Sequence, residues 1–308
     1  MDKADNSSNE IWIECTNYED FEANRPVLFR DDMREQFLKW FRINPEHKVL
    51  DGGCGPGVLT RFIAKGIDSG KVTGFDISKN FVEHGNRRIA EENLTGSAEI
   101  VLEDGFNLSF ADNTFDVIVN HQYIGVLSDP VAGLKELIRV CKPGGTVTVS
   151  GGSGGGLSCD SDCAFENNTR LTELRNRYDQ IFWKIYTSAE LKQSEYWHSR
   201  RYPKMFAECG LKNITIHAYA SAFSYSDNYW SEEFKIFRIK SGIGKDIKNI
   251  KSASEDVRFQ EHGFSRQDFD ELIKLSEEKQ QYYLNNLNDN QDWEWSASMN
   301  YIVVGTKI

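Results

Sequence analysis

One stretch decides the fold of this chain: Val49-Leu50-Asp51-Gly52-Gly53-Cys54-Gly55-Pro56-Gly57-Val58-Leu59-Thr60. Two apolar residues lead into Asp51, glycines occupy positions 53, 55 and 57, and an apolar, helix-compatible segment follows at once. A strand that turns sharply into a helix beneath a ligand needs glycine, because a Cβ would block both the positive φ angle and the ligand's approach to the backbone. The stretch therefore predicts a nucleotide-type binding loop between a buried strand and a helix.

Further segments continue this pattern along the chain. Val72-Thr73-Gly74-Phe75-Asp76 reads as a short strand, and its acid lies 19 residues past Gly57, where a carboxylate can accept hydrogen bonds from a ribose diol. Leu102-Glu103-Asp104-Gly105-Phe106 ends a third strand in an acid, and residues 115–121 read as a fourth. The tight turn Cys141-Lys142-Pro143-Gly144-Gly145 precedes a fifth strand.

Strand and helix patterns alternate through this region. Strands are expected near 48–51, 71–76, 98–102, 115–120 and 145–150, and helices near 57–66, 78–93 and 130–141. Right-handed crossovers between such elements give a parallel sheet with helices on both faces and a ligand site at the carboxyl ends of the strands. The fold class is therefore α/β.

The ordered set of motifs resembles the class I S-adenosylmethionine-dependent methyltransferases, in particular the small-molecule branch that includes quinone C-methylation. The resemblance covers residues 48–150 strongly and residues 202–219 and 299–307 more weakly. It implies a Rossmann-like, seven-stranded, mostly parallel sheet whose last strand is antiparallel and inserts beside the sixth.

About eighty residues separate the sixth and seventh strand patterns, which points to inserted segments. We expect residues 1–150, 202–220 and 298–308 to form the cofactor-binding methyltransferase core. Residues 151–201 and 221–297 are expected to form a helical, substrate-binding lobe.

Two local patterns lie within these expected insertions. Ser265 to Asp268 reads as a capping box. The glycine-rich run 151–156 is expected to be a linker or a hinge beside the active site.

The resemblance implies S-adenosylmethionine as the cofactor and S-adenosylhomocysteine as the product. The backbones of Gly53 and Gly55 are expected at the methionyl portion, Asp76 at the ribose hydroxyls, and Asn120 beneath the sulfonium. Asp51 is expected either to orient the loop or to bind the ammonium group. The full set of expected cofactor-binding residues is Asp51, Gly52, Gly53, Cys54, Gly55, Gly57, Asp76, Ile77, Asp104, Gly105, Phe106, Asn120 and His121.

Two residues are candidates for catalysis. His121 has the reference pKa of a general base and follows a strand end, and Tyr123 lies two residues later. The segment 121–125 lacks the Asn/Asp-Pro-Pro-Tyr motif of amide methyltransferases, which argues against amino groups of bases and glutamine as acceptors.

The rich supply of aromatic residues favours a hydrophobic or aromatic acceptor, and an amine acceptor stays open because aromatic cages attract cations. The pattern leaves open whether O, N, C or S is methylated and whether a general base is needed. The aromatic residues from which an acceptor pocket could be drawn are Tyr123, Tyr186, Trp197, Tyr202, Tyr225, Tyr229, Trp230, Trp293 and Trp295.

Composition limits the partners. The 308 residues carry a net charge of −11, which opposes binding to nucleic-acid backbones. No apolar run is long enough for a membrane span, and residues 1–6 lack the apolar core of a secretory signal, so a cytoplasmic location is expected. Cys159 and Cys163 lack the spacing of a zinc site, so no metal is expected. The oligomeric state stays open.

Two other functions remain to be weighed. One is a non-catalytic module that binds S-adenosylmethionine or a partner protein. The other is an NAD-dependent oxidoreductase, against which Val58 speaks, because the dinucleotide fingerprint needs a glycine at that position.

Overall fold

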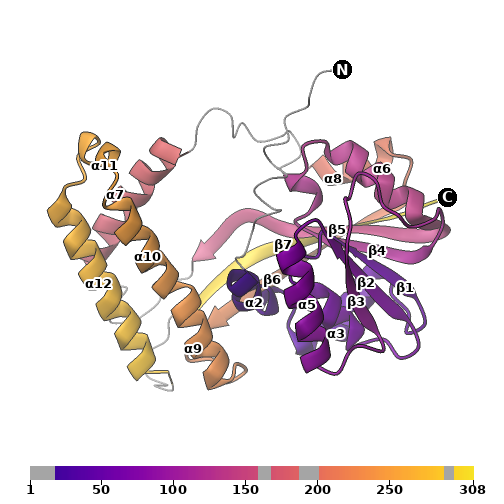
Figure 1. The fold of residues 1–308 in the computed structure, drawn as a ribbon, viewed down its shortest axis with the longest axis horizontal. Coiled ribbons are helices and arrows are strands. Elements are labelled where there is room, and N and C mark those ends of the chain that lie inside the picture. Colours follow the sequence, from indigo (N-terminus) through magenta and orange to yellow (C-terminus); the bar gives the residue numbers. More distant parts are fainter. Residues whose placement is uncertain (1–17, 159–167, 187–200, 288–294) are drawn as a thin grey trace. The chain divides into compact units, whose positions relative to one another are not determined.

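A computed structural model describes residues 18–158, 168–186, 201–287 and 295–308. Its centre is a seven-stranded sheet with the order β3-β2-β1-β4-β5-β7-β6 (Figure 1). The predicted α/β fold with seven strands is confirmed. The strands are β1 (Lys48–Gly52), β2 (Lys71–Asp76), β3 (Ala98–Leu102), β4 (Phe115–His121), β5 (Cys141–Ser158), β6 (Lys212–Ser224) and β7 (Trp295–Thr306).

The first five strands pair in parallel, and helices cover both faces of their sheet. Alternate residues of β1 and β4 enter separate cores: Val49 and Val119 pack against one helix layer, and Leu50 and Ile118 against the other. The first layer contains α3 (Arg34–Phe41), α4 (Val58–Ala64) and α5 (Lys79–Glu91), and the second contains α6 (Pro130–Val140) and α8 (Tyr202–Glu208).

The last strand, β7, runs antiparallel to its neighbour β5, as predicted. Near the start of β5, the Gly144 N–H donates to the Lys307 carbonyl at 2.7 Å, and the Lys307 N–H donates back to the Gly145 carbonyl at 2.9 Å. The end of β7 thus lies beside the beginning of β5. Lys307 also donates through Nζ to the carbonyls of Ile138 and Cys141, which fastens this strand end to the end of α6.

The expected turn at Lys142-Pro143-Gly144-Gly145 lies inside β5 as an irregularity of the strand. Phe115 of β4 pairs with Cys141, whereas Val117 pairs with Thr146, so the intervening residues bulge out of the ladder. Gly144 has φ +79° in this bulge. The glycine-rich run 151–156, expected as a linker or hinge, continues β5 instead.

Helix ends follow the capping signals in the sequence. Asp129 caps α6, accepting from the Ala132 N–H at 2.9 Å, and Ser265 and Asp268 form the predicted capping box of α12 (Arg266–Asn285). Residues before α3 form a 3₁₀ turn, η1 (Asp31–Met33), in which Asp31 pairs with Arg34 and Asp32 pairs with Arg30.

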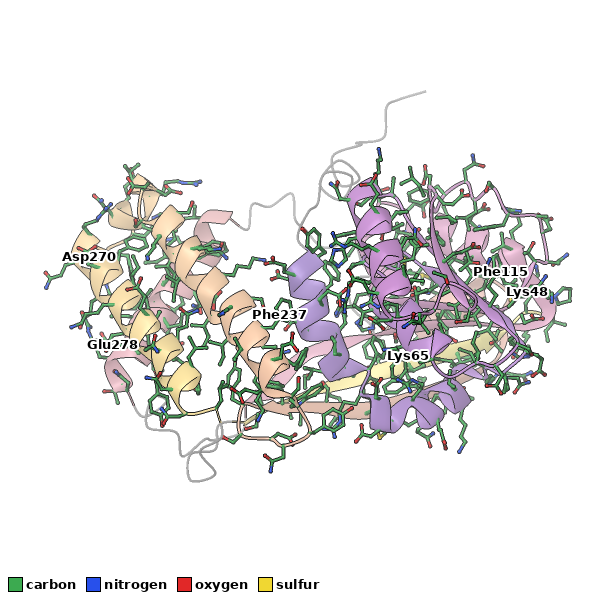
Figure 2. The ribbon with its side chains drawn as sticks, turned by 60° about the horizontal axis from the view of Figure 1, so that its bottom comes forward. Lys48, Lys65, Phe115, Phe237, Asp270 and Glu278 are labelled. Atoms are coloured by element: carbon green, nitrogen blue, oxygen red, sulfur yellow. The ribbon has the colours of Figure 1, made fainter. Side chains whose placement is uncertain are left out.

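The chain divides into two compact units. The first comprises residues 1–156, 194–221 and 298–308, and the second comprises residues 157–193 and 222–297. The second unit has an aromatic core around Phe259, Phe264 and Phe269, while Asp270 and Glu278 lie on the exposed side of α12 (Figure 2). Its helices are α7 (Thr169–Tyr186), α9 (Glu232–Ser241), α10 (Ile243–Ala253), α11 (Val257–Glu261) and α12.

Candidate functional site

The predicted site residues lie where parallel strands end at one edge of the sheet. Gly52 of β1 is in register with Phe75 of β2 and with Asn120 of β4. His121, which ends β4, is opposite Ser150 of β5. Because parallel strands all point the same way, the segments that follow them meet at this edge.

The glycine loop after β1 crosses toward β2. The Cys54 N–H donates to the Phe75 carbonyl at 2.9 Å, which carries the loop over the neighbouring strand. Gly57 starts α4 with φ +78°, and a Cβ there would lie 2.3 Å from the Ile100 side chain. Both the conformation and the space therefore require glycine at position 57.

Asp76 is held by the same loop. Its carboxylate accepts from the Gly55 N–H through Oδ2 at 2.8 Å and from the Ser78 N–H through Oδ1 at 2.9 Å. Burial raises the pKa of Asp76, and the backbone hydrogen bonds oppose that rise. Ile77, another of the expected cofactor-binding residues, follows directly and is half-buried. A carboxylate with two oxygens at this position can still accept from a ribose diol through its remaining lone pairs.

Asp51 lies beneath the loop and is buried. Its Oδ2 accepts from the Thr60 hydroxyl of α4 at 2.7 Å. Burial raises the pKa of Asp51 to about 7, and the nearby charge of Asp76 adds to that rise. Asp51 therefore changes its charge near neutral pH, which an aspartate in water does not do.

The third strand end forms the expected acid-containing turn. The Asp104 carboxylate accepts from the Phe106 N–H at 3.0 Å, and the Asp104 carbonyl accepts from the Asn107 N–H at 2.9 Å. Asp104 is exposed, whereas Gly105 is buried. The carboxylate thus shapes the turn that presents the backbone of residues 105 and 106.

Asn120 and His121 bring polar groups to the end of β4. Asn120 donates through Nδ2 to the Thr148 carbonyl at 2.8 Å, and its Oδ1 is buried without a hydrogen-bond partner among the described residues. His121 Nδ1 lies 3.0 Å from the Ser150 hydroxyl, and its Nε2 is also buried without a partner in the same part of the chain.

The hydrogen bonds of Ser150 assign the tautomer of His121. The Ser150 hydroxyl donates its one proton to the Asn120 carbonyl at 3.3 Å, so Ser150 Oγ accepts from His121 Nδ1–H. The proton-free nitrogen is then Nε2. Burial lowers the pKa of His121 well below its usual value, and the charge of Arg25 lowers it further, so the ring is neutral at pH 7. A neutral imidazole with a free Nε2 lone pair can accept a proton.

Tyr123 lies across two of the predicted cofactor contacts. A Cβ at Gly53 would lie 2.0 Å from its ring, and a Cβ at Gly105 would lie 1.6 Å from its hydroxyl oxygen. The ring therefore lies directly against both glycines, and it is perpendicular to the Phe75 ring. The Tyr123 hydroxyl is buried without a hydrogen-bond partner within the described ranges, and burial raises its pKa. A ligand that reaches the same face of Gly53 must displace this ring.

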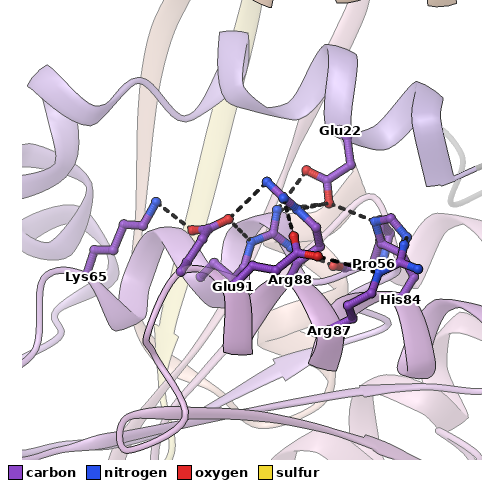
Figure 3. A network of polar contacts seen from close by, with 9 residues as sticks. Glu22, Pro56, Lys65, His84, Arg87, Arg88 and Glu91 are labelled. Atoms are coloured by element: carbon purple, nitrogen blue, oxygen red, sulfur yellow. Dashed lines mark hydrogen bonds and ion pairs between the residues drawn. The ribbon is translucent and has the colours of Figure 1, made fainter.

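An ionic network fastens α2 (Tyr18–Leu28) to the glycine loop (Figure 3). Arg61 of α4 donates to Glu22 of α2 at 2.7 Å, to Glu92 at 2.9 Å and to the Pro56 carbonyl at 2.8 Å. Arg61 is 4% exposed, so these are the well-formed contacts that a buried guanidinium needs. His84 of α5 extends the network to Glu22 at 3.3 Å.

The expected aromatic residues that the structure describes belong to both compact units. Tyr225 and Trp230 pack around Phe223 in the second unit, whereas Tyr202 of the first unit lies beside Tyr301. Trp197, Trp293, Cys159 and Cys163 lie outside the described residues. Among the described residues, no three His, Cys, Asp or Glu side chains come together as metal ligands, and no helix could cross a membrane.

Residues 49–145 match a family profile described as a methyltransferase domain. The match covers the glycine loop, the acids after β2 and β3, and the end of β4. This chain carries a class I S-adenosylmethionine-dependent methyltransferase domain. The cofactor of that family is S-adenosylmethionine.

Two relatives match part of this chain. An uncharacterized methyltransferase of Schizosaccharomyces pombe is 38% identical over 105 residues, which cover 32% of this chain and 38% of that protein. A demethylmenaquinone methyltransferase of Geobacillus is 33% identical over 127 residues, 40% of this chain and 54% of that protein. The chain thus spans about half the length of these relatives or less.

Among solved structures, a phosphoethanolamine N-methyltransferase of Haemonchus contortus superposes with a TM-score of 0.44 at 18% identity. The superposition covers 90% of this chain and 52% of that one.

Three residues near the carboxyl ends of the strands were not predicted from the sequence. Thr60 and Ser150 carry no motif of their own, yet they hold Asp51 and His121. Arg25 precedes the domain by many residues and donates to Gln122 at 2.7 Å. Its only signal is that it lies in an aromatic-rich stretch, 11–29, which the composition predicts to be packed.

Proposed function

We propose that this chain transfers a methyl group from S-adenosylmethionine to a small, hydrophobic or aromatic molecule by direct in-line displacement. One observation carries the proposal: the loop that binds Asp76 and the neutral His121 occupy the same edge of the sheet. The acid proposed for the ribose and the base proposed for the acceptor thus end the two strands, β2 and β4, that flank β1.

The residues present suit the cofactor's polar groups. Asp76 would accept from the ribose hydroxyls, and Asp51, once ionised, would attract the ammonium group. The backbone after Asp104 would face the adenine edge. Asn120 Oδ1, which is buried without a partner among the described residues, could accept from the ligand. When bound, the cofactor supplies an electrophilic methyl group on a sulfonium.

His121 would act as the general base where the acceptor must lose a proton. Its Nε2 lone pair is available because Nδ1–H is engaged by Ser150. Ser150 thereby fixes both the tautomer and the orientation of the ring. The protein's further contribution would be positioning, for which effective molarities of about 10⁵ M or more are known in well-oriented systems.

The relatives suggest a first class of acceptor to test. The Geobacillus protein, and a 27% identical protein of Staphylococcus aureus, are demethylmenaquinone methyltransferases. A hydroquinone is aromatic, and its phenolic hydroxyl groups are weak acids. Both properties suit a site with a neutral base in an apolar setting. We further propose that the second unit, residues 157–193 and 222–297, serves acceptor recognition.

Two measurements test the proposed function. Calorimetry should show binding of S-adenosylhomocysteine and none of NAD. Incubation with tritium-labelled S-adenosylmethionine and a metabolite extract should yield a labelled product. Binding of NAD alone would overturn the cofactor assignment. Binding of S-adenosylhomocysteine without any labelled product, in extracts and with hydroquinones, would favour a non-catalytic module.

A further inference from the structure

Arg25 is a cation without an acidic partner. It lies on α2 and is partly buried, and no carboxylate lies within ion-pair distance of it in residues 18–158, 168–186, 201–287 and 295–308. It donates a hydrogen bond to the neutral amide of Gln122 at 2.7 Å, and the centroid of the Phe21 ring lies 5.3 Å from its guanidinium carbon. Burial lowers the pKa of Arg25 to about 10, although it remains charged at pH 7. A partly desolvated cation of this kind attracts an anion.

The charge of this guanidinium reaches two buried polar groups that lack hydrogen-bond partners among the described residues. His121 Nε2 and the Tyr219 hydroxyl are both buried without hydrogen-bond partners in the described part of the chain. Arg25 acts electrostatically on both: its charge lowers the pKa of His121 and opposes the rise that burial causes in the pKa of Tyr219. The three groups come from α2, β4 and β6.

Aromatic rings join the three groups into one cluster. The ring centroid of Phe29, one helical turn past Arg25, lies 5.0 Å from that of His121 and 5.4 Å from that of Phe37. Phe37 in turn contacts the Tyr219 ring at 4.9 Å. The side chains of His121 and Tyr219 are therefore linked by aromatic rings, and in such an apolar surrounding a charge interaction is stronger than in water.

We propose that Arg25, with the Tyr219 hydroxyl, forms an anion-binding site beside His121 that receives a carboxylate or phenolate oxygen of a bound ligand. The guanidinium supplies the charge and two donors, and the Tyr219 hydroxyl supplies a third. The anion belongs either to the methyl acceptor or to the amino-acid portion of the cofactor.

This inference deepens the proposed function, because it assigns an acidic oxygen to a ligand of the same site. Its test uses binding alone, so that failed methyl transfer does not decide it. The probes are benzoate and uncharged benzamide on protein saturated with S-adenosylhomocysteine. A second pair, S-adenosylhomocysteine and 5′-methylthioadenosine, differs by the amino-acid portion.

An acceptor-side anion predicts that wild-type protein binds benzoate at least about tenfold more tightly than benzamide. The Arg25→Gln variant should lose this preference and Arg25→Lys should keep part of it. A cofactor-side anion predicts instead that Arg25→Gln weakens S-adenosylhomocysteine and leaves 5′-methylthioadenosine unchanged. Lys39→Gln, which removes an exposed cation from α3, should have neither effect.

The melting temperature of the ligand-free protein distinguishes an anion site from a structural role. If Arg25 only stabilised the fold, its removal would lower the melting temperature. Removing an unpaired, partly buried charge should raise the melting temperature of Arg25→Met by a few degrees. The proposal is overturned if Arg25→Met lowers the melting temperature, or if Arg25→Gln changes neither preference.

Discussion

The Gly55 N–H donates a hydrogen bond to the Asp76 carboxylate at 2.8 Å. This bond joins the loop after the first strand to the acid after the second strand. The Asp76 carboxylate thus fixes the conformation of the loop. We propose that it also binds the ribose.

Asp76→Ala should weaken binding of S-adenosylhomocysteine by about 1–3 kcal/mol, because charge-assisted hydrogen bonds are lost. Calorimetry measures this directly. The 2′-deoxy analogue of S-adenosylhomocysteine separates the two roles of Asp76. If Asp76 contacts the ribose, the losses of binding free energy from the mutation and from removal of the hydroxyl will not be additive. Fully additive losses would assign Asp76 to loop structure alone. Asp68→Ala, an exposed acid before β2, is the matched control.

Cofactor affinity should depend on pH through Asp51. With a pKa of about 7 in the free protein, this carboxyl is mostly neutral at pH 6 and mostly ionised at pH 8. If the ionised form attracts the ammonium group, affinity for S-adenosylhomocysteine should rise by about tenfold across that range. The affinity of Asp51→Asn should be flat with pH, and a flat wild-type profile would remove Asp51 from the ammonium site.

The same carboxyl predicts the sign of a stability change. Because the folded-state pKa of Asp51 is raised above its unfolded value, the folded protein holds the extra proton. The contribution of Asp51 to the free energy of unfolding should therefore fall as pH rises from about 4 to about 7. Asp51→Asn should lack this component when urea unfolding is compared at the two pH values.

Removing the Tyr123 ring should speed cofactor binding. The ring lies against Gly53 and Gly105, so a ligand contacting those faces must wait for it to move. Stopped-flow binding of S-adenosylhomocysteine should show a several-fold higher association rate for Tyr123→Leu. Tyr123→Phe keeps the ring and removes a buried, unpartnered hydroxyl, so its association rate should match the wild type. Equal rates for all three proteins would show that the ring does not obstruct entry.

His121→Gln should lower turnover of the identified acceptor by about 10²–10⁴-fold, the usual contribution of a general base. Since the pKa of His121 is lowered well below 6.5, the wild-type rate should be constant from pH 6.5 upward and fall only in more acidic solution. Affinity for S-adenosylhomocysteine should stay within about twofold. A large loss of that affinity with unchanged turnover would make His121 a cofactor contact only.

Local motifs explain why much of the sheet could be predicted. The glycine loop, Asp76 and the cap at Asp129 each depend on a few neighbouring residues, and the strands follow as buried runs between them. Helix α2 escaped prediction, because Pro26 lies inside it and proline usually ends a helix. The contact of Arg25 with Gln122 and that of Tyr123 with Gly53 join residues about seventy or more positions apart, and no local pattern encodes such pairs.

The buried guanidinium of Arg61 has a dynamic consequence. Because it binds Glu22, Glu92 and the Pro56 carbonyl together, opening any one of these contacts exposes the others to water. The backbone amides of Cys54, Gly55 and Gly57 and the non-proline amides of α2 should then exchange with deuterium as one cooperative unit. Helix α2 and the glycine loop would thus open together, as one unit.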